Sequence, residues 1–182
     1  MEFVPTRLPD VMVIRPKVFE DARGFFMDTW HRQRFEQEGI DATFVQDSRS
    51  GSKAGTIRGL HYQIKQAQGK LIRVVKGEAF DVAVDIRRTS PDFGQWAGEV
   101  LSAENRKMIW IPPGFAHGFL VLSETAEFEY KLTDFYAPEH ERTLLWDDPD
   151  IGIDWPLLDG EKPELSDKDS LGIPLKDADV YD

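Results

Sequence analysis

Short apolar runs interrupted by glycine and proline cover most of this chain, and long stretches of helical periodicity are scarce. Runs such as Ala79–Ile86 and Met108–Ile111 have the length of strands and are followed by turn-forming residues. Many short strands at even spacing favour a sheet that closes on itself as a sandwich or a barrel. The pattern therefore predicts an all-β fold with a few short peripheral helices.

The runs also place the expected elements along the chain. The expected strands are Val11–Ile14, Phe25–Trp30, Thr43–Gln46, Thr56–Gln63, Lys70–Val75, Ala79–Ile86, Glu99–Leu101, Met108–Ile111, Gly118–Leu122 and Ala126–Leu132. A short helix is expected over His31–Glu38, where Gly39 ends it. After Tyr136 the periodicity fades and the chain ends in an acidic tail. We therefore expect a single domain over 1–182, with residues 137–182 wrapping the barrel.

Charge and composition narrow the partners that this chain can have. It has 182 residues, a formal net charge of −11 and a sequence pI of about 4.8. Nucleic acids and anionic membranes attract basic surfaces, so we expect neither as a partner. The absence of cysteine excludes disulfides and thiolate chemistry. Because no stretch resembles a signal peptide or a membrane span, we expect a cytoplasmic protein.

Alternation along the strands predicts which polar side chains face the interior. Tyr130 shares the apolar parity of its strand with Phe128, so it is expected to point into the barrel. Lys70 shares parity with Ile72, although the other face of that strand is apolar too. His61 and Arg58 have opposite parity within one strand. If both served one pocket, a bulge or twist between them would be needed.

Two glycine-bounded strings each carry a histidine, namely RGLHYQ at 58–63 and PPGFAHGF at 112–119. They resemble the paired motifs of the cupin superfamily, which implies a double-stranded β-helix (jelly-roll) barrel. A metal-binding cupin would offer a second histidine and a downstream glutamate in the first motif. Here Gln63 replaces that histidine, and residues 64–71 contain no carboxylate. With His61 and His117 alone at the motifs, we expect no metal site.

A longer series of strings makes the resemblance more specific. In order, the strings are Phe19-x-Asp21-x-Arg23-Gly24-x-Phe26, Gln46-Asp47, Arg58-Gly59-Leu60-His61-Tyr62-Gln63, Asp81-Val82-x-x-Asp85-x-Arg87, Gly114-Phe115-x-His117-Gly118-Phe119, Tyr130-Lys131, Trp146-x-Asp148-Pro149 and Leu165-Ser166-x-Lys168-Asp169. From about Val13 to Leu175, this series resembles the dTDP-4-dehydrorhamnose 3,5-epimerase family.

The resemblance implies an isomerase that epimerises dTDP-4-dehydro-6-deoxy-D-glucose at C3 and C5, the carbons beside its C4 ketone, to give dTDP-4-dehydro-L-rhamnose for dTDP-rhamnose biosynthesis. Such a reaction needs a base, a group that stabilises the enolate oxygen, and an acid on the opposite face. It needs no redox cofactor, and the sequence has neither a GxGxxG nor a Walker-type loop. We therefore expect no cofactor.

Other activities start from the same enolate or the same barrel. A cupin that epimerises C3 or C5 alone, or one that moves the ketone between C3 and C4, could use the same base and acid. A non-catalytic cupin that binds sugar nucleotides would need no acid and base on opposite faces. A metal-dependent cupin oxygenase would need the ligands that are missing here.

Four residues match the catalytic positions of the family. His61 matches the base, and histidine suits that role because its ordinary pKa lies near neutral pH. Asp169 matches the carboxylate that would orient this imidazole, with Asp167 as a neighbouring rival. Lys70 matches the cation that stabilises the enolate. Tyr130 matches the acid on the far face, because a phenol stays protonated at neutral pH.

Further positions match residues that bind the nucleotide-sugar in the family. Arg23, Arg58 and Lys168 are implied near the diphosphate, which guanidinium groups grip bidentately. Phe26 and Tyr136 are implied as stacking partners of the base or the sugar. The remaining implied binding residues are Asp28, Gln46, Asp47, Ser48, His117 and Glu141. Asp28 stands where glutamate is common and Ser48 where asparagine is common, so these two positions depart from the family's pattern.

Ordinary structural roles compete with several of these assignments. Without the resemblance, His61 is a hydrogen-bonded core histidine, and Tyr130 is a packing residue with a satisfied hydroxyl. Lys70 could extend to the rim, and Ser166 could simply cap a helix. The resemblance also implies a homodimer that exchanges an N-terminal strand, so that residues near Arg23 would reach the partner's site.

Overall fold

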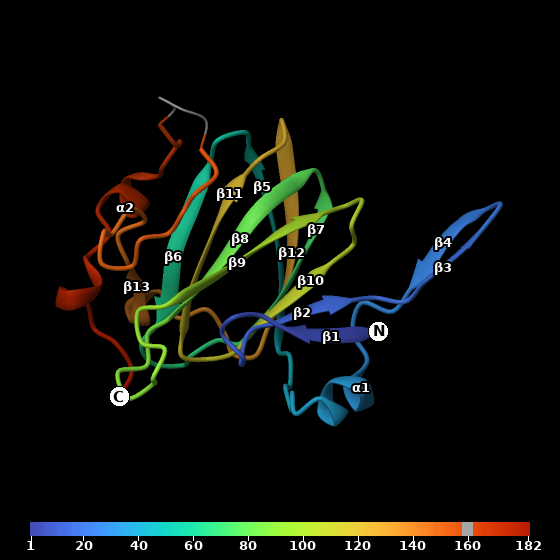
Figure 1. Ribbon diagram of the computed structural model, residues 1–182, viewed down its shortest axis with the longest axis horizontal. Helices are drawn as coiled ribbons and strands as arrows, with labels where there is room; N and C mark the ends of the chain where they lie inside the picture. The colour runs from blue at the N-terminus through green and yellow to red at the C-terminus, as the bar shows by residue number, and fades with distance from the viewer. Residues whose placement is uncertain (158–161) are drawn as a thin grey trace.

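Two antiparallel sheets make up most of the protein and enclose its interior (Figure 1). The computed structural model describes residues 1–157 and 162–182. In sheet order, the six-stranded sheet consists of β1 (Glu2–Pro5), β2 (Met12–Arg15), β10 (Met108–Ile111), β7 (Lys70–Lys76), β12 (Thr125–Leu132) and β5 (Gln46–Lys53). The five-stranded sheet consists of β13 (Glu141–Thr143), β6 (Ile57–Gln63), β11 (Phe115–Val121), β8 (Glu78–Asp85) and β9 (Trp96–Ser102).

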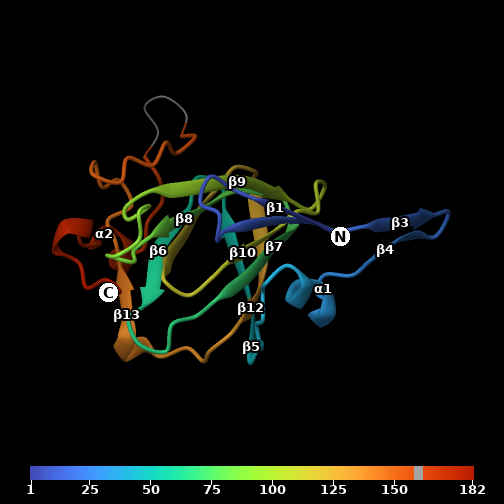
Figure 2. The ribbon, with the colours of Figure 1, turned by 60° about the horizontal axis from the view of Figure 1, so that its bottom comes forward.

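Aromatic and aliphatic side chains fill the space between the sheets. Ile72 of β7, Phe119 of β11 and Phe128 of β12 belong to one buried cluster. The rings of Phe119 and Phe128 stack with their centroids 4.0 Å apart across the two sheets. Burial of a large apolar side chain stabilises the fold by about 1.5–3 kcal/mol. The predicted all-β cupin barrel is confirmed, and Figure 2 shows its strands surrounding the interior.

The helices are short and lie outside the sheets. They are α1 (Arg32–Gln37), α2 (Asp167–Ser170) and the 3₁₀ turns η1 (Pro138–His140) and η2 (Leu175–Asp177). The helix expected over His31–Glu38 is confirmed as α1, which buries Phe35. Leu71, on the outward face of β7, packs in the same cluster as Phe35. Among the described residues, none of the helices has the length and hydropathy that crossing a membrane requires.

Strand β5 differs from its expected position. The expected strand over Thr43–Gln46 is wrong, because regular pairing begins at Gln46 and continues to Lys53. The strand QDSRSGSK has no apolar alternation that would reveal it, but it pairs with all of β12 from Leu132 back to Thr125. The position of β5 is therefore set by its pairing with β12, whose apolar residues pack into the interior.

The bulge required to bring Arg58 and His61 to one side is present in β6. His117 of β11 pairs with His61, and Phe119 of β11 pairs with Arg58. Between these two pairs, β6 therefore contains one residue more than β11. Gly59 lies at this irregularity with φ of +120°, and a Cβ there would lie 2.5 Å from the Gly118 Cα. Glycine is therefore needed for both the backbone angle and the close approach. The extra residue reverses the parity, so Arg58 and His61 reach the same cavity.

The segment after β12 runs along the outer side of β6 (Figure 1). Isolated bridges join Thr56 to Glu164 and Leu144 to Ile173. The Tyr181 hydroxyl donates a hydrogen bond to the Gln63 carbonyl at the end of β6. These contacts place α2 beside β6. Residues 158–161, which belong to the segment expected to wrap the barrel, lie outside the described residues.

A hairpin of β3 (Val18–Asp21) and β4 (Gly24–Met27) extends away from the barrel, and we call it the arm (Figures 1 and 2). It carries three aromatic side chains that are more than half exposed: Phe19, Phe25 and Phe26. Arg106 contacts the arm near its turn, where it pairs with Glu20 at 2.6 Å and lies over the Phe25 ring. Exposed apolar surface concentrated on a projecting hairpin is typical of a protein contact.

Candidate active site

A cavity of about 230 Å³ lies between the two sheets. Six of its lining residues are predicted site residues on the strands from β5 to β12: Ser48, Arg58, His61, Lys70, His117 and Tyr130. Two more, Tyr136 and Glu141, lie in the segment that follows β12. Residues far apart in the sequence therefore meet in one concave site, as expected for a small-molecule pocket.

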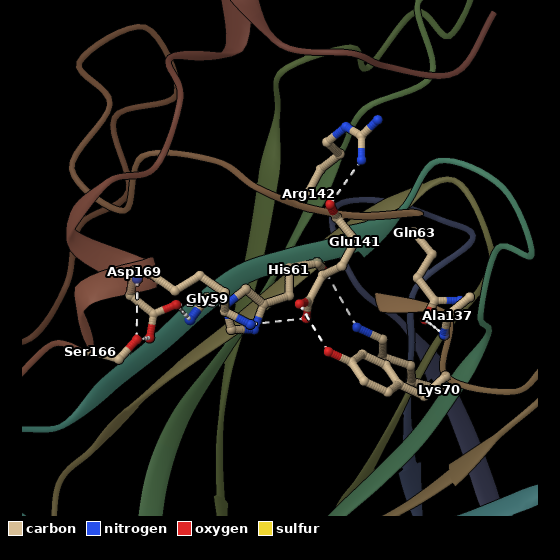
Figure 3. A network of polar contacts seen from close by, with 11 residues as sticks. Gly59, His61, Gln63, Lys70, Ala137, Glu141, Arg142, Ser166 and Asp169 are labelled. Carbon is tan, nitrogen blue, oxygen red and sulfur yellow. Dashed lines mark hydrogen bonds and ion pairs between the residues drawn. The ribbon is translucent and has the colours of Figure 1, made fainter. Parts of the chain in front are cut away.

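His61 and Asp169 form a short polar contact at the edge of this cavity (Figure 3). His61 Nε2 lies 2.5 Å from Asp169 Oδ1, and the Asp169 side chain is only 3% exposed. A carboxylate accepts hydrogen bonds, so Nε2 carries the proton and the neutral ring has its lone pair on Nδ1. This arrangement provides an oriented base whose protonated form is stabilised by Asp169.

Helix α2 carries Asp169, and the N-cap of this helix holds the Asp169 carboxylate in place. Ser166 is the N-cap, and its hydroxyl accepts from the Asp169 amide at 3.2 Å and donates to Asp169 Oδ2 at 2.8 Å. The Gly59 amide also donates to Asp169 Oδ1 at 3.4 Å. Burial raises the pKa of Asp169, but the hydrogen bond and charge of His61 and the bonds from Ser166 and Gly59 together lower it below its ordinary value. Asp169, and not Asp167, is the partner of His61.

Lys70 points into the cavity from β7, as its parity with Ile72 predicted. Its ammonium donates to the His61 carbonyl at 3.3 Å, and Figure 3 shows it on the side of His61 away from Asp169. Burial lowers the pKa of Lys70 to about 8, against the attraction of Asp81 and Glu141. At neutral pH the group is therefore a cation in a partly desolvated place, where it acts more strongly on a developing oxyanion than it would in water.

Tyr130 points inward from β12, as predicted. Its ring stacks on Phe128 at 5.9 Å between centroids, and its hydroxyl lies 2.9 Å from Ser50 Oγ. Burial raises the pKa of Tyr130 well above its ordinary value. The phenol therefore stays protonated at neutral pH and can donate a proton.

His117 is buried beside Asp81, a residue to which the sequence assigned no role. His117 Nε2 lies 2.9 Å from Asp81 Oδ2, and both side chains are almost fully buried. Burial lowers the pKa of His117 despite the opposing attraction of Asp81. An acidic residue within the apolar run AFDVAV was the signal that could have identified Asp81.

Glu141 links the charged groups at the rim of the cavity. Its Oε1 accepts from the Lys168 ammonium at 3.0 Å, and its Oε2 accepts from the Tyr136 hydroxyl at 3.2 Å. The Tyr136 amide donates to Gln46 Oε1 at 3.0 Å, and Gln46 Nε2 donates to Ser48 Oγ at 3.0 Å. The predicted residues of this group therefore form one connected rim.

Gln63 stands where a metal-binding cupin has a histidine ligand, and in this structure it has a structural role. Its Nε2 donates to the Gln66 carbonyl at 2.7 Å and to the Phe135 carbonyl at 3.2 Å. Its Oε1 accepts from the Ala137 amide at 2.9 Å (Figure 3). These bonds hold the segment that carries Tyr136 against β6. Over 1–157 and 162–182, no group of three or more His, Cys, Asp or Glu side chains could hold a metal ion.

Four predicted binding residues are not brought to this cavity within one chain. Asp47 lies on the outward side of β5, where Lys131 pairs with it at 3.0 Å. Arg23 and Phe26 belong to the exposed arm, and Arg23 pairs with Asp21 at 2.5 Å. Asp28 follows the arm and pairs with Arg34 at 3.4 Å.

Comparisons with known proteins agree with this geometry. Residues 5–177 match the family model described as dTDP-4-dehydrorhamnose 3,5-epimerase. The dTDP-4-dehydrorhamnose 3,5-epimerase of Pseudomonas aeruginosa is 59% identical over 175 residues, covering 96% of each chain. The enzyme of the same name from Shigella flexneri is 53% identical over 183 residues, covering 100% of this chain and 99% of the other.

A solved structure shares the whole architecture. The crystal structure of the dTDP-6-deoxy-D-glucose-3,5-epimerase of Legionella pneumophila, in complex with dTDP-4-keto-L-rhamnose, superposes with a TM-score of 0.95. It is 49% identical in sequence, and the match covers 99% of this chain and 97% of that one. By sequence, by fold and by the residues gathered in its cavity, this chain belongs to the dTDP-4-dehydrorhamnose 3,5-epimerase family.

Proposed function

We propose that this protein epimerises dTDP-4-dehydro-6-deoxy-D-glucose at C3 and C5 to dTDP-4-dehydro-L-rhamnose, with His61 as the base and Tyr130 as the acid. One observation carries the assignment of roles. His61 belongs to the five-stranded sheet and Tyr130 to the facing six-stranded sheet, and both line one cavity. Inversion requires proton removal on one face of a carbon and proton return on the other, and facing sheets provide those two sides.

Each inversion begins with proton abstraction by His61. The imidazole removes the proton from the carbon beside the ketone, and the C–H electron pair moves toward the carbonyl oxygen to form an enolate. Asp169 stabilises the resulting imidazolium through its contact with Nε2. The Lys70 ammonium stabilises the negative oxygen, which is worth more in the barrel than in water.

Inversion is completed from the opposite wall. As the enolate collapses, the carbon takes the proton of the Tyr130 hydroxyl, and the O–H electron pair stays on the phenolic oxygen. His61 and Tyr130 then return to their starting protonation states by exchange with solvent. The same groups serve both carbons, because C3 and C5 flank one ketone.

The nucleotide diphosphate is held by the charged groups at the rim in this proposal. Arg58 lies at the cavity, where Nε donates to Ser52 Oγ at 2.9 Å, and Lys168 pairs with Glu141. These cations supply a local positive field within a chain of net charge −11. His117, Gln46 and Ser48 contribute polar groups nearby, and Tyr136 offers a ring for stacking.

We also propose that the protein acts as a homodimer. Arg23, Phe26 and Asp28 would then act in the partner's cavity, to which the arm carries them. The exposed aromatic residues of the arm support this assignment, because a partner would bury them. We further propose that residues 1–182 form one domain, with residues 137–182 wrapping the barrel, and that the enzyme works in the cytoplasm.

Isotope exchange in deuterated water tests the reaction. The protein is incubated with dTDP-4-dehydro-6-deoxy-D-glucose, and deuterium and configuration at C3 and C5 are followed by NMR. Deuterium and inversion at both carbons are expected. Label at one carbon alone would establish a mono-epimerase, and migration of the ketone would establish an isomerase of another type; either result would contradict the proposal.

A further inference from the structure

Strand β5 presents a row of serine hydroxyls to the interior of the barrel. Ser48, Ser50 and Ser52 alternate with exposed residues and are all partly buried. Ser48 accepts from Gln46, and Ser52 accepts from Arg58 at 2.9 Å. Ser50 contacts the hydroxyl of Tyr130 on the neighbouring strand at 2.9 Å. Each of these serines therefore contacts a different member of the proposed site.

The contact between Ser50 and Tyr130 is the one closest to the chemistry. Among the residues that the structure describes, Ser50 is the sole hydrogen-bond partner of the Tyr130 hydroxyl. The ring itself is held by Phe128, which stacks on it, and by His117, which meets it edge-on with centroids 6.4 Å apart. The aromatic neighbours set the plane of the phenol, but they offer no donor to its oxygen.

We propose that Ser50 is a positioning residue that holds the Tyr130 oxygen and donates a hydrogen bond to the phenolate left after proton delivery. This inference rests on the proposed function, in which Tyr130 is the acid. When the phenol gives its proton to carbon, its own hydrogen points at the substrate, so the Ser50 hydroxyl must be the donor. Ser50 keeps its proton throughout, and the negative charge stays on the phenolic oxygen.

The surroundings of Tyr130 make such a donor necessary. Burial raises the pKa of the phenol and the charge of Asp81 raises it further, so its anion is costly in this place, while the Ser50 hydrogen bond and the charge of Arg58 oppose that cost. A hydrogen bond to a charged group stabilises it more than one to a neutral group does. Ser50 therefore lowers the barrier of proton return while leaving proton abstraction by His61 untouched.

Because Ser50 is proposed to act on proton return alone, the ratio of inversion to exchange distinguishes a positioning role from general structural damage. When His61 removes a proton and returns a solvent deuteron to the same face, the carbon exchanges without inverting. In Ser50→Ala, exchange is expected to continue, while the ratio of inversion to exchange falls roughly ten- to hundredfold. Tyr130→Phe sets the lower limit of this ratio. Ser50→Thr restores a hydroxyl and is expected to restore the ratio.

Ser52→Ala is the matched control on the same face of the same strand. It removes one hydroxyl from Arg58, so it is expected to raise KM and to leave the ratio of inversion to exchange unchanged. A Ser50→Ala ratio equal to that of the wild type would overturn the proposal, as would a Ser50→Thr ratio as low as that of Ser50→Ala. A wild type with neither exchange nor inversion would instead refute the proposed function and, with it, this role of Ser50.

Discussion

His61 and Asp169 are separated by 108 positions in the sequence, yet Nε2 of the first lies 2.5 Å from Oδ1 of the second. A strand of the barrel supplies the imidazole, and the short helix α2 in the segment after the barrel supplies the carboxylate. The C-terminal segment therefore completes the base of the proposed reaction as well as covering the sheet.

Asp169→Asn tests whether this carboxylate activates His61. The amide is nearly isosteric, but it cannot stabilise an imidazolium and does not favour the same tautomer. We expect kcat to fall roughly a hundredfold or more, with a smaller change in KM. Asp167→Asn is the matched control, because Asp167 is exposed on the same helix. Equal losses in the two variants would contradict the assigned role.

The same pair predicts an acid-dependent contribution to stability. The pKa of Asp169 is lowered in the folded protein, so its stabilising contribution is present above the ordinary aspartate pKa of about 3.9 and is lost as pH falls through the lowered value. We expect wild type to exceed Asp169→Asn in free energy of unfolding at pH 7, and this difference to shrink below pH of about 4. Urea unfolding at a series of pH values measures it. A difference that grows toward acid pH would have the wrong sign.

Lys70 predicts the alkaline limit of activity. Its pKa is about 8, so kcat/KM should fall as pH rises above that value and the ammonium is lost. Lys70→Arg keeps its charge at higher pH, so in this variant the alkaline limb should move upward even if the maximum rate is lower. Lys53→Arg, at the exposed end of β5, should leave the limb in place. An unshifted limb in Lys70→Arg would show that another group is responsible.

Lys70 also predicts a conflict between activity and stability. Because folding lowers the pKa of Lys70, the buried ammonium destabilises the folded protein. This destabilisation is complete below pH of about 8 and disappears above the ordinary lysine pKa. Lys70→Met should therefore raise the free energy of unfolding at pH 7 by roughly 1–3 kcal/mol while abolishing most activity. Chemical unfolding at pH 7 and at pH 10.5 checks this, since most of the gain should be lost at the higher pH.

Mixed dimers test the proposed role of the arm. The Arg23 side chain is 89% exposed in one chain, so its action on substrate requires another protomer. In a heterodimer of Arg23→Ala and His61→Ala subunits, one cavity has its own His61 and receives an intact Arg23 from the partner. We expect such heterodimers, purified with two affinity tags, to recover about half of the wild-type activity per dimer. Heterodimers as inactive as the two parent homodimers would show that Arg23 does not act in the partner's site.

The sequence predicted the barrel well where apolar residues alternate or run together. Met108–Ile111 coincides with β10, and parity placed Tyr130 inside; for Lys70 parity was ambiguous, because both faces of its strand are apolar. It failed at β5, because a strand of serine, arginine and aspartate owes its place to the apolar strand beside it. It also assigned no role to Asp81, although this acidic residue stands out within an apolar run, or to Ser50; both roles come from contacts across strands.

The central claim is that His61 removes the protons beside the ketone, and solvent exchange with His61→Ala tests it most directly. The variant is incubated with dTDP-4-dehydro-6-deoxy-D-glucose in deuterated water, and deuterium at C3 and C5 is followed by NMR beside the wild type. We predict rapid labelling of both carbons by the wild type and almost none by His61→Ala, with the variant still folded by circular dichroism. Wild-type labelling of both carbons by His61→Ala would contradict the account.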